Sequence, residues 1–355
     1  MRAFYCQKCG ERLFSENSFC LKCNSTLGFL PDLCDLSVIE PAGNDTWKAK
    51  SPAAVDRLYR RCLNEKQEKA CTWMIPVEDT NAYCTSCRLN RTIPDLSLPE
   101  NNMLWRKMET AKRRLIYSLL RLGLPVFPKS PTNALGLSFD ILSDAESTAA
   151  VGNRILTGHS EGVITMNLSE ADDAERERMR QSMGEVYRTP LGHFRHESGH
   201  YYWDLLVRNH PQIDSVRAVF GDERVDYGQA IQQHYARGGA APGWESCFVT
   251  PYAASHPWED WAETWAHYLH IIDTLETAAG SGVELRSKEG VSVMRDPYGC
   301  TFDDIRTDWH ALRFVVNSLN RSMGLPDPYP FILSDLITSK LAFIHEWVQK
   351  TAKKN

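Results

Sequence analysis

The sequence predicts an α+β chain in which a helix-rich C-terminal domain follows small cysteine-rich modules. Nine of the eleven cysteines lie before residue 90, which sets an N-terminal region apart from the rest. Beyond it, apolar residues recur at helical spacing over long segments, and residues 156–172 have the pattern of a turn and a strand. We therefore predict one module over residues 1–30, a second with its linker over 31–95, and a domain over 96–355.

The composition is that of a globular protein, with 43% hydrophobic and 24% charged residues in a chain of 355. A net charge of −5 gives no reason to expect nucleic acid or an anionic membrane as the main partner. No window of 18 uncharged apolar residues suggests a membrane span, and the start, MRAFYCQKCGERLF, lacks an apolar signal core. We expect a cytoplasmic protein, in which CxxC pairs are metal ligands rather than disulfides.

The first cysteine set has the spacing of a closed zinc site. Each CxxC forms a tight turn whose two thiolates can meet one ion, and two such turns complete a tetrahedron. A redox dithiol would instead need one CxxC at the start of a helix in a larger domain. We predict a structural zinc ribbon in residues 1–30, with the ligands Cys6, Cys9, Cys20 and Cys23.

A second set of four cysteines has looser spacing and consists of Cys62, Cys71, Cys84 and Cys87. Only the last two have the CxxC spacing, so buried free thiols are the alternative to a second structural zinc, which we favour. Such zinc modules bind nucleic acid, protein or nothing, so they predict structure more than function. A protein partner is the expectation we keep for them.

Residues 89–102 carry two prolines and turn residues, and this composition suits a linker. The helix predicted after it, from about residue 104, carries six basic residues, for which we predict a solvated face: Arg106, Lys107, Lys112, Arg113, Arg114 and Arg121.

The segment His196-Glu197-Ser198-Gly199-His200 is an H-E-x-x-H motif. Positions i and i+4 share one face of a helix, so His196 and His200 can direct imidazole nitrogens at one zinc ion. Glu197 then lies beside the ion, where it can take a proton from a water. Thr189 and Pro190 make a plausible helix start, and apolar residues on both sides can pack in the core.

A hydrolytic zinc site needs a third protein ligand and one open position. The metzincin pattern is excluded, because it requires Gly and His where this chain has Trp203 and Leu206. The better candidates are Glu259 and Glu263, four apart on a helix predicted to begin at Pro257, where one carboxylate can bind zinc and the other can orient a ligand histidine. The competing candidates are Asp222, Asp226, His267 and His270.

The H-E-x-G-H helix followed by a helix with E-x-x-A-E resembles the gluzincin class of metallopeptidases, and locally the catalytic domain of anthrax lethal factor. This resemblance implies that Glu259 is the third ligand and that Glu263 holds a ligand histidine in place. It also implies that Tyr252, seven residues before Glu259, stabilises the transition state. Asp204, one turn after His200, is a weaker candidate for holding a ligand histidine in place.

Over its full length the chain is similar to a bacterial family with an N-terminal zinc ribbon and a zinc metallopeptidase domain. The segments that carry this similarity are CRLNRTIPDL, FGDERVDYG, PWEDWAE and LNRSMGLPDPYPFIL. The family resemblance implies a zinc metallopeptidase. The two cysteine sets and the H-E-x-x-H site together predict two structural zinc ions and one catalytic zinc ion.

Residues 156–172 could offer a strand edge to an extended substrate, or form an ordinary core hairpin. Residues 325–348 could wall one side of the cleft or form a packed C-terminal helix behind a proline-rich entry, and we favour the packed helix. The function expected from the sequence is hydrolysis of a peptide or amide bond, with zinc, Glu197 as general base and Tyr252 as donor to the oxyanion. The alternatives are a non-enzymatic zinc-ribbon adaptor for protein or nucleic acid, and an amidase for a small molecule or an isopeptide.

Overall fold

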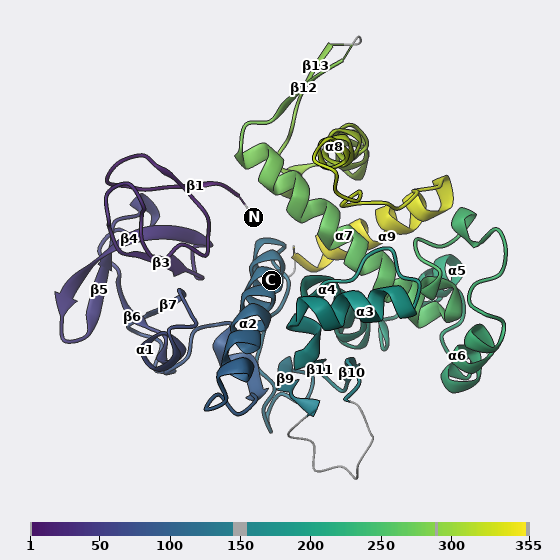
Figure 1. The fold of residues 1–355 in the computed structure, drawn as a ribbon, viewed down its shortest axis with the longest axis horizontal. Coiled ribbons are helices and arrows are strands. Elements are labelled where there is room, and N and C mark those ends of the chain that lie inside the picture. Colours follow the sequence, from purple (N-terminus) through teal and green to yellow (C-terminus); the bar gives the residue numbers. More distant parts are fainter. Residues whose placement is uncertain (1, 145–154, 288–289, 353–355) are drawn as a thin grey trace.

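The computed structural model describes residues 2–144, 155–287 and 290–352. Strands dominate the N-terminal part and helices the C-terminal part, and α2 stands between them (Figure 1). The α+β, helix-rich fold predicted from the sequence is confirmed. None of the helices in the described part of the chain has the length and apolar character of a membrane span.

The N-terminal part combines a hairpin with an antiparallel sheet. Strands β1 (Phe4–Tyr5) and β2 (Arg12–Leu13) form the hairpin that carries the first CxxC turn. The sheet has the order β3-β4-β5-β6-β7, with strands Leu27–Leu30, Asp35–Gly43, Thr46–Ala49, Leu58–Arg61 and Met74–Pro76. Helix α1 (Leu63–Glu68) follows Cys62, which is its N-cap residue.

The segment expected to be a linker is built into the C-terminal domain. Strand β8 (Asn90–Thr92) pairs in parallel with β9 (Ser138–Leu142). The resulting sheet has the order β10-β11-β9-β8, in which β10 (Gly158–Ser160) and β11 (Val163–Asn167) are antiparallel and β11 and β9 are parallel. The linker prediction was wrong for these residues, because backbone pairing with a strand about fifty positions later is not visible in local composition.

Helix α2 (Pro99–Arg121) joins the two parts of the molecule. Its Tyr117 ring lies 5.9 Å from the Phe29 ring of β3, and one hydrophobic core continues from Phe4 to Val348. The prediction of a solvated basic face was wrong for Lys112 and Arg113, which are 0% and 8% exposed. Lys112 Nζ lies 2.6 Å from the buried Glu109 carboxylate, so the burial of these charges is compensated by ion pairing.

Two crossing helices form the centre of the C-terminal domain. Helix α4 (Pro190–Tyr202) begins where predicted, with the Thr189 side chain accepting a hydrogen bond from the Gly192 amide at 3.0 Å. Helix α7 (Pro257–Gly280) also begins at the predicted proline. At the crossing, a Cβ on Gly199 would lie 2.8 Å from Ala262 Cα, closer than any side chain tolerates. The absence of a side chain there lets the two backbones approach.

The remaining helices surround this pair. They are α3 (Asp173–Ser182), α5 (Ile213–Phe220), α6 (Tyr227–Ala236), α8 (Phe302–Ser322) and α9 (Asp335–Ala352). Strands β12 (Glu284–Ser287) and β13 (Gly290–Val293) form a hairpin that projects from the end of α7 (Figure 1). Helix α9 packs on α7 with its buried face, which agrees with the packed C-terminal helix predicted from the sequence.

Candidate active site

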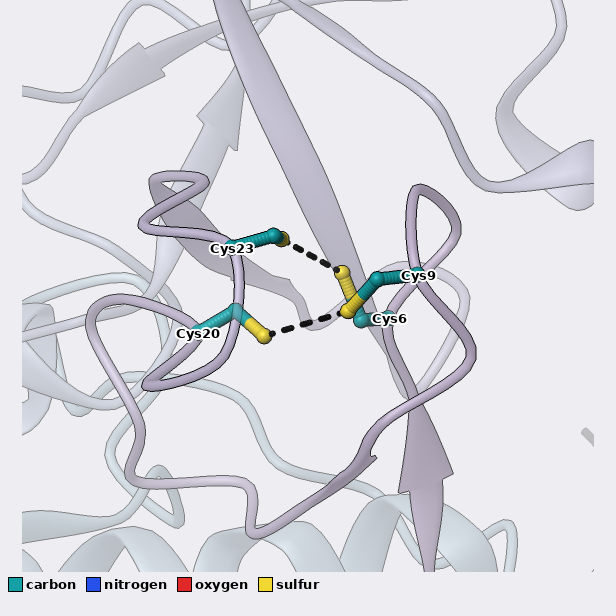
Figure 2. A group of neighbouring side chains, drawn as sticks. All are labelled: Cys6, Cys9, Cys20 and Cys23. Carbon is teal, nitrogen blue, oxygen red and sulfur yellow. Dashed lines mark hydrogen bonds between the residues drawn. The ribbon is translucent and has the colours of Figure 1, made fainter.

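The first cysteine set comes together in the N-terminal hairpin region. Figure 2 shows the sulfur atoms of the two CxxC turns facing each other. The Sγ atoms of Cys6 and Cys23 are 3.6 Å apart, as are those of Cys9 and Cys20. All four Sγ atoms lie within 4.8 Å of one another. Thiolates at about 2.3 Å from a tetrahedral ion would be separated by about 3.8 Å, so this quartet fits zinc.

The second cysteine set also converges, despite its looser spacing. Cys71 Sγ lies 3.7 Å from the sulfur atoms of both Cys84 and Cys87, and all four side chains are buried. Backbone amides supply hydrogen bonds to the sulfurs: Cys84 N donates to Cys62 Sγ at 3.4 Å, and Trp73 N donates to Cys71 Sγ at 3.4 Å. Amide donors stabilise the thiolate form of cysteine, which is the form that binds a metal ion.

Helix α2 contributes charged side chains beside this second quartet. Glu109 Oε2 lies 3.8 Å from Cys87 Sγ, and its other oxygen accepts from Asn90 at 2.9 Å. Lys112 bonds to both Glu109 and Asn90, and Arg113 donates to the Ala70 carbonyl at 2.8 Å, next to Cys71. The two buried cations offset the negative charge that thiolates and Glu109 would bring to this place.

The two histidines of the H-E-x-x-H motif point at a common position. The Nε2 atoms of His196 and His200 are 3.1 Å apart, and both rings lie on the face of α4 that meets α7. The His200 ring is 4.0 Å from the Trp258 ring, which packs against it from the start of α7. His196 is 13% exposed and His200 5% at the side chain, so the pair is enclosed but not sealed.

Helix α7 places Glu259 against both histidines. Its Oε2 atom lies 3.1 Å from His196 Nε2 and 3.3 Å from His200 Nε2. Among the described residues, none makes a hydrogen bond of good geometry to Oε2, although the side chain is 1% exposed. A tetrahedral ion with ligand atoms at about 2.0–2.1 Å would separate them by about 3.3 Å. The three atoms therefore form a triangle of the size that fits zinc.

Glu263, one turn further along α7, contacts the other side of the His196 ring. Its Oε1 lies 2.6 Å from His196 Nδ1, and its Oε2 accepts from Thr250 Oγ1 at 2.7 Å. Burial opposes ionisation of this carboxyl, but the His196 hydrogen bond outweighs it and holds the pKa of Glu263 below its usual range. With Nδ1 as donor to the carboxylate, His196 keeps the Nε2 lone pair for a metal.

Glu197 and Tyr252 border the same position. The ligand atoms of His196, Glu197 and His200 lie within 4.8 Å of one another. Glu197 is 5% exposed, and its Oε2 has no hydrogen-bond partner among the described residues. The Tyr252 ring lies 5.9 Å from the His196 ring, in the turn that precedes α7. Burial raises the pKa of the Tyr252 phenol, which therefore stays protonated and can donate a hydrogen bond.

Other residues considered from the sequence lie elsewhere. Asp222 pairs with Arg224 at 2.7 Å, and Asp226 caps α6 by accepting from the Gln229 amide at 2.7 Å. Asp204 pairs with Arg208 at 2.8 Å, while His200 Nδ1 has no hydrogen-bond partner within the described ranges. The remaining candidates, His267 and His270, pack among the aromatic rings of Tyr329, Phe331 and Trp309.

Sequence reasoning missed Tyr227, whose hydroxyl donates to Glu259 Oε1 at 2.8 Å. It also missed Thr250, which holds Glu263, and His256, which accepts from the Trp258 amide and lies 3.1 Å from the Val225 carbonyl. Tyr227 belongs to the FGDERVDYG segment, but only the aspartates of that segment were considered as ligands. No local signal indicates that a tyrosine 32 positions earlier reaches the α7 carboxylate.

An edge strand runs beside the motif helix. Strand β10 is the outer member of its sheet and contacts α4. Its His159 ring lies 6.5 Å from the His200 ring in a stacked arrangement. The strand and turn predicted over residues 156–172 are therefore present, next to the histidine pair.

Comparison with known proteins agrees with this arrangement. Residues 101–347 match the family described as "Putative zinc-binding metallo-peptidase", and residues 3–98 match a zinc-ribbon domain. Uncharacterised proteins of Mycobacterium tuberculosis and Mycobacterium bovis are 40% identical over 353 residues, which is 99% of this chain and 96% of theirs. No solved structure matches the chain. These matches and the three residue clusters together support zinc binding, and the chain belongs to the zinc-binding metallo-peptidase family, with a zinc-ribbon domain before the family's own domain.

Proposed function

We propose that this protein hydrolyses a peptide or amide bond with a zinc ion held by His196, His200 and Glu259. The observation that carries the proposal is the convergence of two Nε2 atoms and one carboxylate oxygen at 3.1–3.3 Å from one another. Three protein ligands leave one position open, which distinguishes a catalytic zinc from a structural one.

Zinc in this position would act as a Lewis acid that polarises a carbonyl and lowers the pKa of water. Glu197 is the general base of the proposal. One of its carboxylate oxygens lies within 4.8 Å of ligand nitrogens of both histidines, and its buried Oε2 has no hydrogen-bond partner within the described ranges. The carboxylate can therefore accept a proton from the attacking water. The same carboxyl then returns the proton to the leaving amine.

Tyr252 is the proposed donor to the oxyanion that forms as the carbonyl is attacked. Its raised pKa keeps the hydroxyl proton in place at neutral pH. Donation of a hydrogen bond to developing negative charge stabilises the transition state more than the ground state. Glu263 completes the arrangement by fixing the ring of His196 through Nδ1.

An extended peptide is the substrate that the surroundings favour. The outer edge of β10 has no strand beside it within the described sheet, and β10 lies against the motif helix. A peptide added to this edge by main-chain hydrogen bonds would run past His196 and His200. The two cysteine quartets are proposed as structural zinc sites, which gives three zinc ions per chain, and their outer surface as the place for a protein partner.

Native mass spectrometry of the purified chain tests the metal content, with three zinc ions expected. His196→Ala and His200→Ala variants should each retain two. A peptide library incubated with wild type and with Glu197→Gln then tests hydrolysis, and products should appear with the wild type alone. Three zinc ions without any cleavage of peptides or amides would favour the adaptor alternative instead.

A further inference from the structure

Tyr227 shares the carboxylate of Glu259 with the metal position. Its hydroxyl donates to Oε1 at 2.8 Å, while Oε2 of the same carboxylate faces the two histidines. A tyrosine ordinarily titrates at about pH 10, so at neutral pH its hydroxyl keeps the proton that it donates. The two carboxylate oxygens of Glu259 therefore have different surroundings. Oε1 accepts a hydrogen bond from a neutral hydroxyl, and Oε2 faces two imidazoles.

The position of Tyr227 is imposed by the loop that carries it. His256 lies with Nε2 3.1 Å from the Val225 carbonyl, which ties this loop to the first turn of α7. Asp226 then caps α6 through the Gln229 amide, so the helix begins at Tyr227. The Tyr227 ring packs edge-on against the rings of His256 at 5.2 Å and Trp258 at 5.8 Å.

Tyr227 lies partly at the surface. Although its hydroxyl reaches the buried carboxylate, the residue is 41% exposed, so little of the hydrophobic core depends on it. The contribution of its hydroxyl can thus be separated from the stability of the fold.

We infer that Tyr227 is a positioning residue of the metal centre, which restricts Glu259 to binding through Oε2 alone. This inference rests on the proposed function. A carboxylate with both oxygens free can bind an ion through both and fill the position that a water or carbonyl needs. Engaging Oε1 in a hydrogen bond prevents this, and it also aligns the ligand before the ion binds.

Tyr227→Phe is the variant that tests the inference, because it removes one oxygen atom and keeps the ring. Tyr117→Phe is the matched control. Tyr117 also donates to a glutamate of α7, with its hydroxyl 2.6 Å from Glu276 Oε1, but about 25 Å further along that helix from Glu259. The control therefore loses the same kind of bond on the same helix without touching the metal position.

Two measurements are made on protein from which dialysis has removed the metal bound by His196, His200 and Glu259. The zinc ions of the two cysteine quartets are left in place. Zinc affinity is measured by competition with a chromophoric chelator, and Co²⁺ is added in place of zinc to record its visible absorption. We expect Tyr227→Phe to weaken zinc binding about 10–100-fold. Its Co²⁺ band should weaken as the coordination number rises, whereas Tyr117→Phe should match the wild type in both measurements.

The outcomes separate the inference from the function on which it rests. If the wild type binds zinc and Co²⁺ at this site, but Tyr227→Phe equals Tyr117→Phe in affinity and in spectrum, the role of Tyr227 is wrong and the proposed function stands. If the wild type takes up no more metal than His196→Ala, the proposed metal centre is wrong and the inference fails with it.

Discussion

His196 Nδ1 and Glu263 Oε1 lie 2.6 Å apart, although 67 positions separate the two residues in the chain. The contact joins α4 to α7. It holds the His196 ring so that Nε2, and not Nδ1, faces the proposed metal position. It also separates the tasks of two glutamates one turn apart, because Glu259 faces Nε2 and Glu263 faces Nδ1.

A substitution of Glu259 and a substitution of Glu263 should therefore weaken zinc binding to different extents. Glu259→Ala should remove zinc from the open site, since it deletes a ligand atom. Glu263→Gln keeps the shape of the side chain but loses its charge, and should weaken affinity about 10–100-fold. Chelator competition measures both, with Glu177→Gln on the exposed face of α3 as a control. A variant of Glu263 that loses zinc completely while Glu259→Ala retains it would reverse the two assignments.

Glu197→Gln should keep the fold and all bound zinc but lose hydrolysis, because an amide cannot accept the water proton. General acid–base contributions are typically about 10²–10⁴-fold, so a loss of kcat of that order or larger is expected. The comparison requires a substrate cleaved by the wild type and zinc content measured on the same samples. Unchanged kcat in a fully loaded variant would exclude Glu197 as the base.

A chelator should abolish activity at a lower concentration than the concentration at which it unfolds the protein. The open site offers three protein ligands and contact with solvent, whereas each cysteine quartet offers four thiolates, and the second quartet is fully buried. Phenanthroline titration, followed by activity and by circular dichroism, should show loss of activity at lower chelator concentration than loss of structure. Coincident loss at every concentration would mean that the sites do not have separate roles.

Lys112→Met should destabilise the protein by about 3–5 kcal/mol, the usual effect of leaving one charge of a buried pair without its partner. Lys112 is fully buried, and its Nζ lies 2.6 Å from Glu109 beside the second quartet. Urea unfolding measures the change. The double variant Lys112→Met with Glu109→Gln should recover part of the loss, and a double variant no more stable than the single one would argue against an electrostatic cause.

The buried His267 should contribute to a loss of stability in acid. Burial lowers its pKa to about 4, against the opposing charge of Glu263, whereas an unfolded histidine titrates near 6.5. Between these values the unfolded chain binds a proton that the folded chain does not, so the free energy of unfolding falls as pH falls. For this one group the decrease is about 1 kcal/mol between pH 6.5 and 5.5. His267→Gln keeps a polar partner for Tyr329 and should show a flatter pH dependence of its melting temperature over that range.

The sequence was sufficient wherever the decisive residues lie close together in the chain. The spacing of His196 and His200 within one helical turn, and of Glu259 and Glu263 within another, predicts which side chains share a face. Pro190 and Pro257 mark the helix starts for the same local reason. The family resemblance then supplied the relation between the two helices, which spacing alone could not.

Contacts between distant segments account for what the sequence did not predict. Tyr227 reaches Glu259 from 32 positions away, and nothing in its own segment distinguishes it from a surface tyrosine. Lys112 and Arg113 have the spacing of an exposed basic face, but a cysteine quartet folds against that face and buries them. Strand β8 pairs with a strand about fifty residues later. Its local composition resembles that of a linker because nothing near it in the chain indicates this pairing.

Gly199 gives the motif a constraint that its chemistry does not reveal. A Cβ at this position would meet Ala262 Cα at 2.8 Å and Trp265 Cβ at 3.2 Å, and Trp261 Nε1 donates to the Gly199 carbonyl at 3.0 Å. The second x of H-E-x-x-H therefore cannot be any residue in this protein, because the residue at this position sets how close α4 and α7 can come. A diverged copy of the gene could preserve both histidines and all three glutamates of the site and still encode a protein in which α4 and α7 cannot come this close, if a larger residue replaced this glycine. Surveys that classify such genes as active or decayed should examine the glycine together with the residues that bear the chemistry.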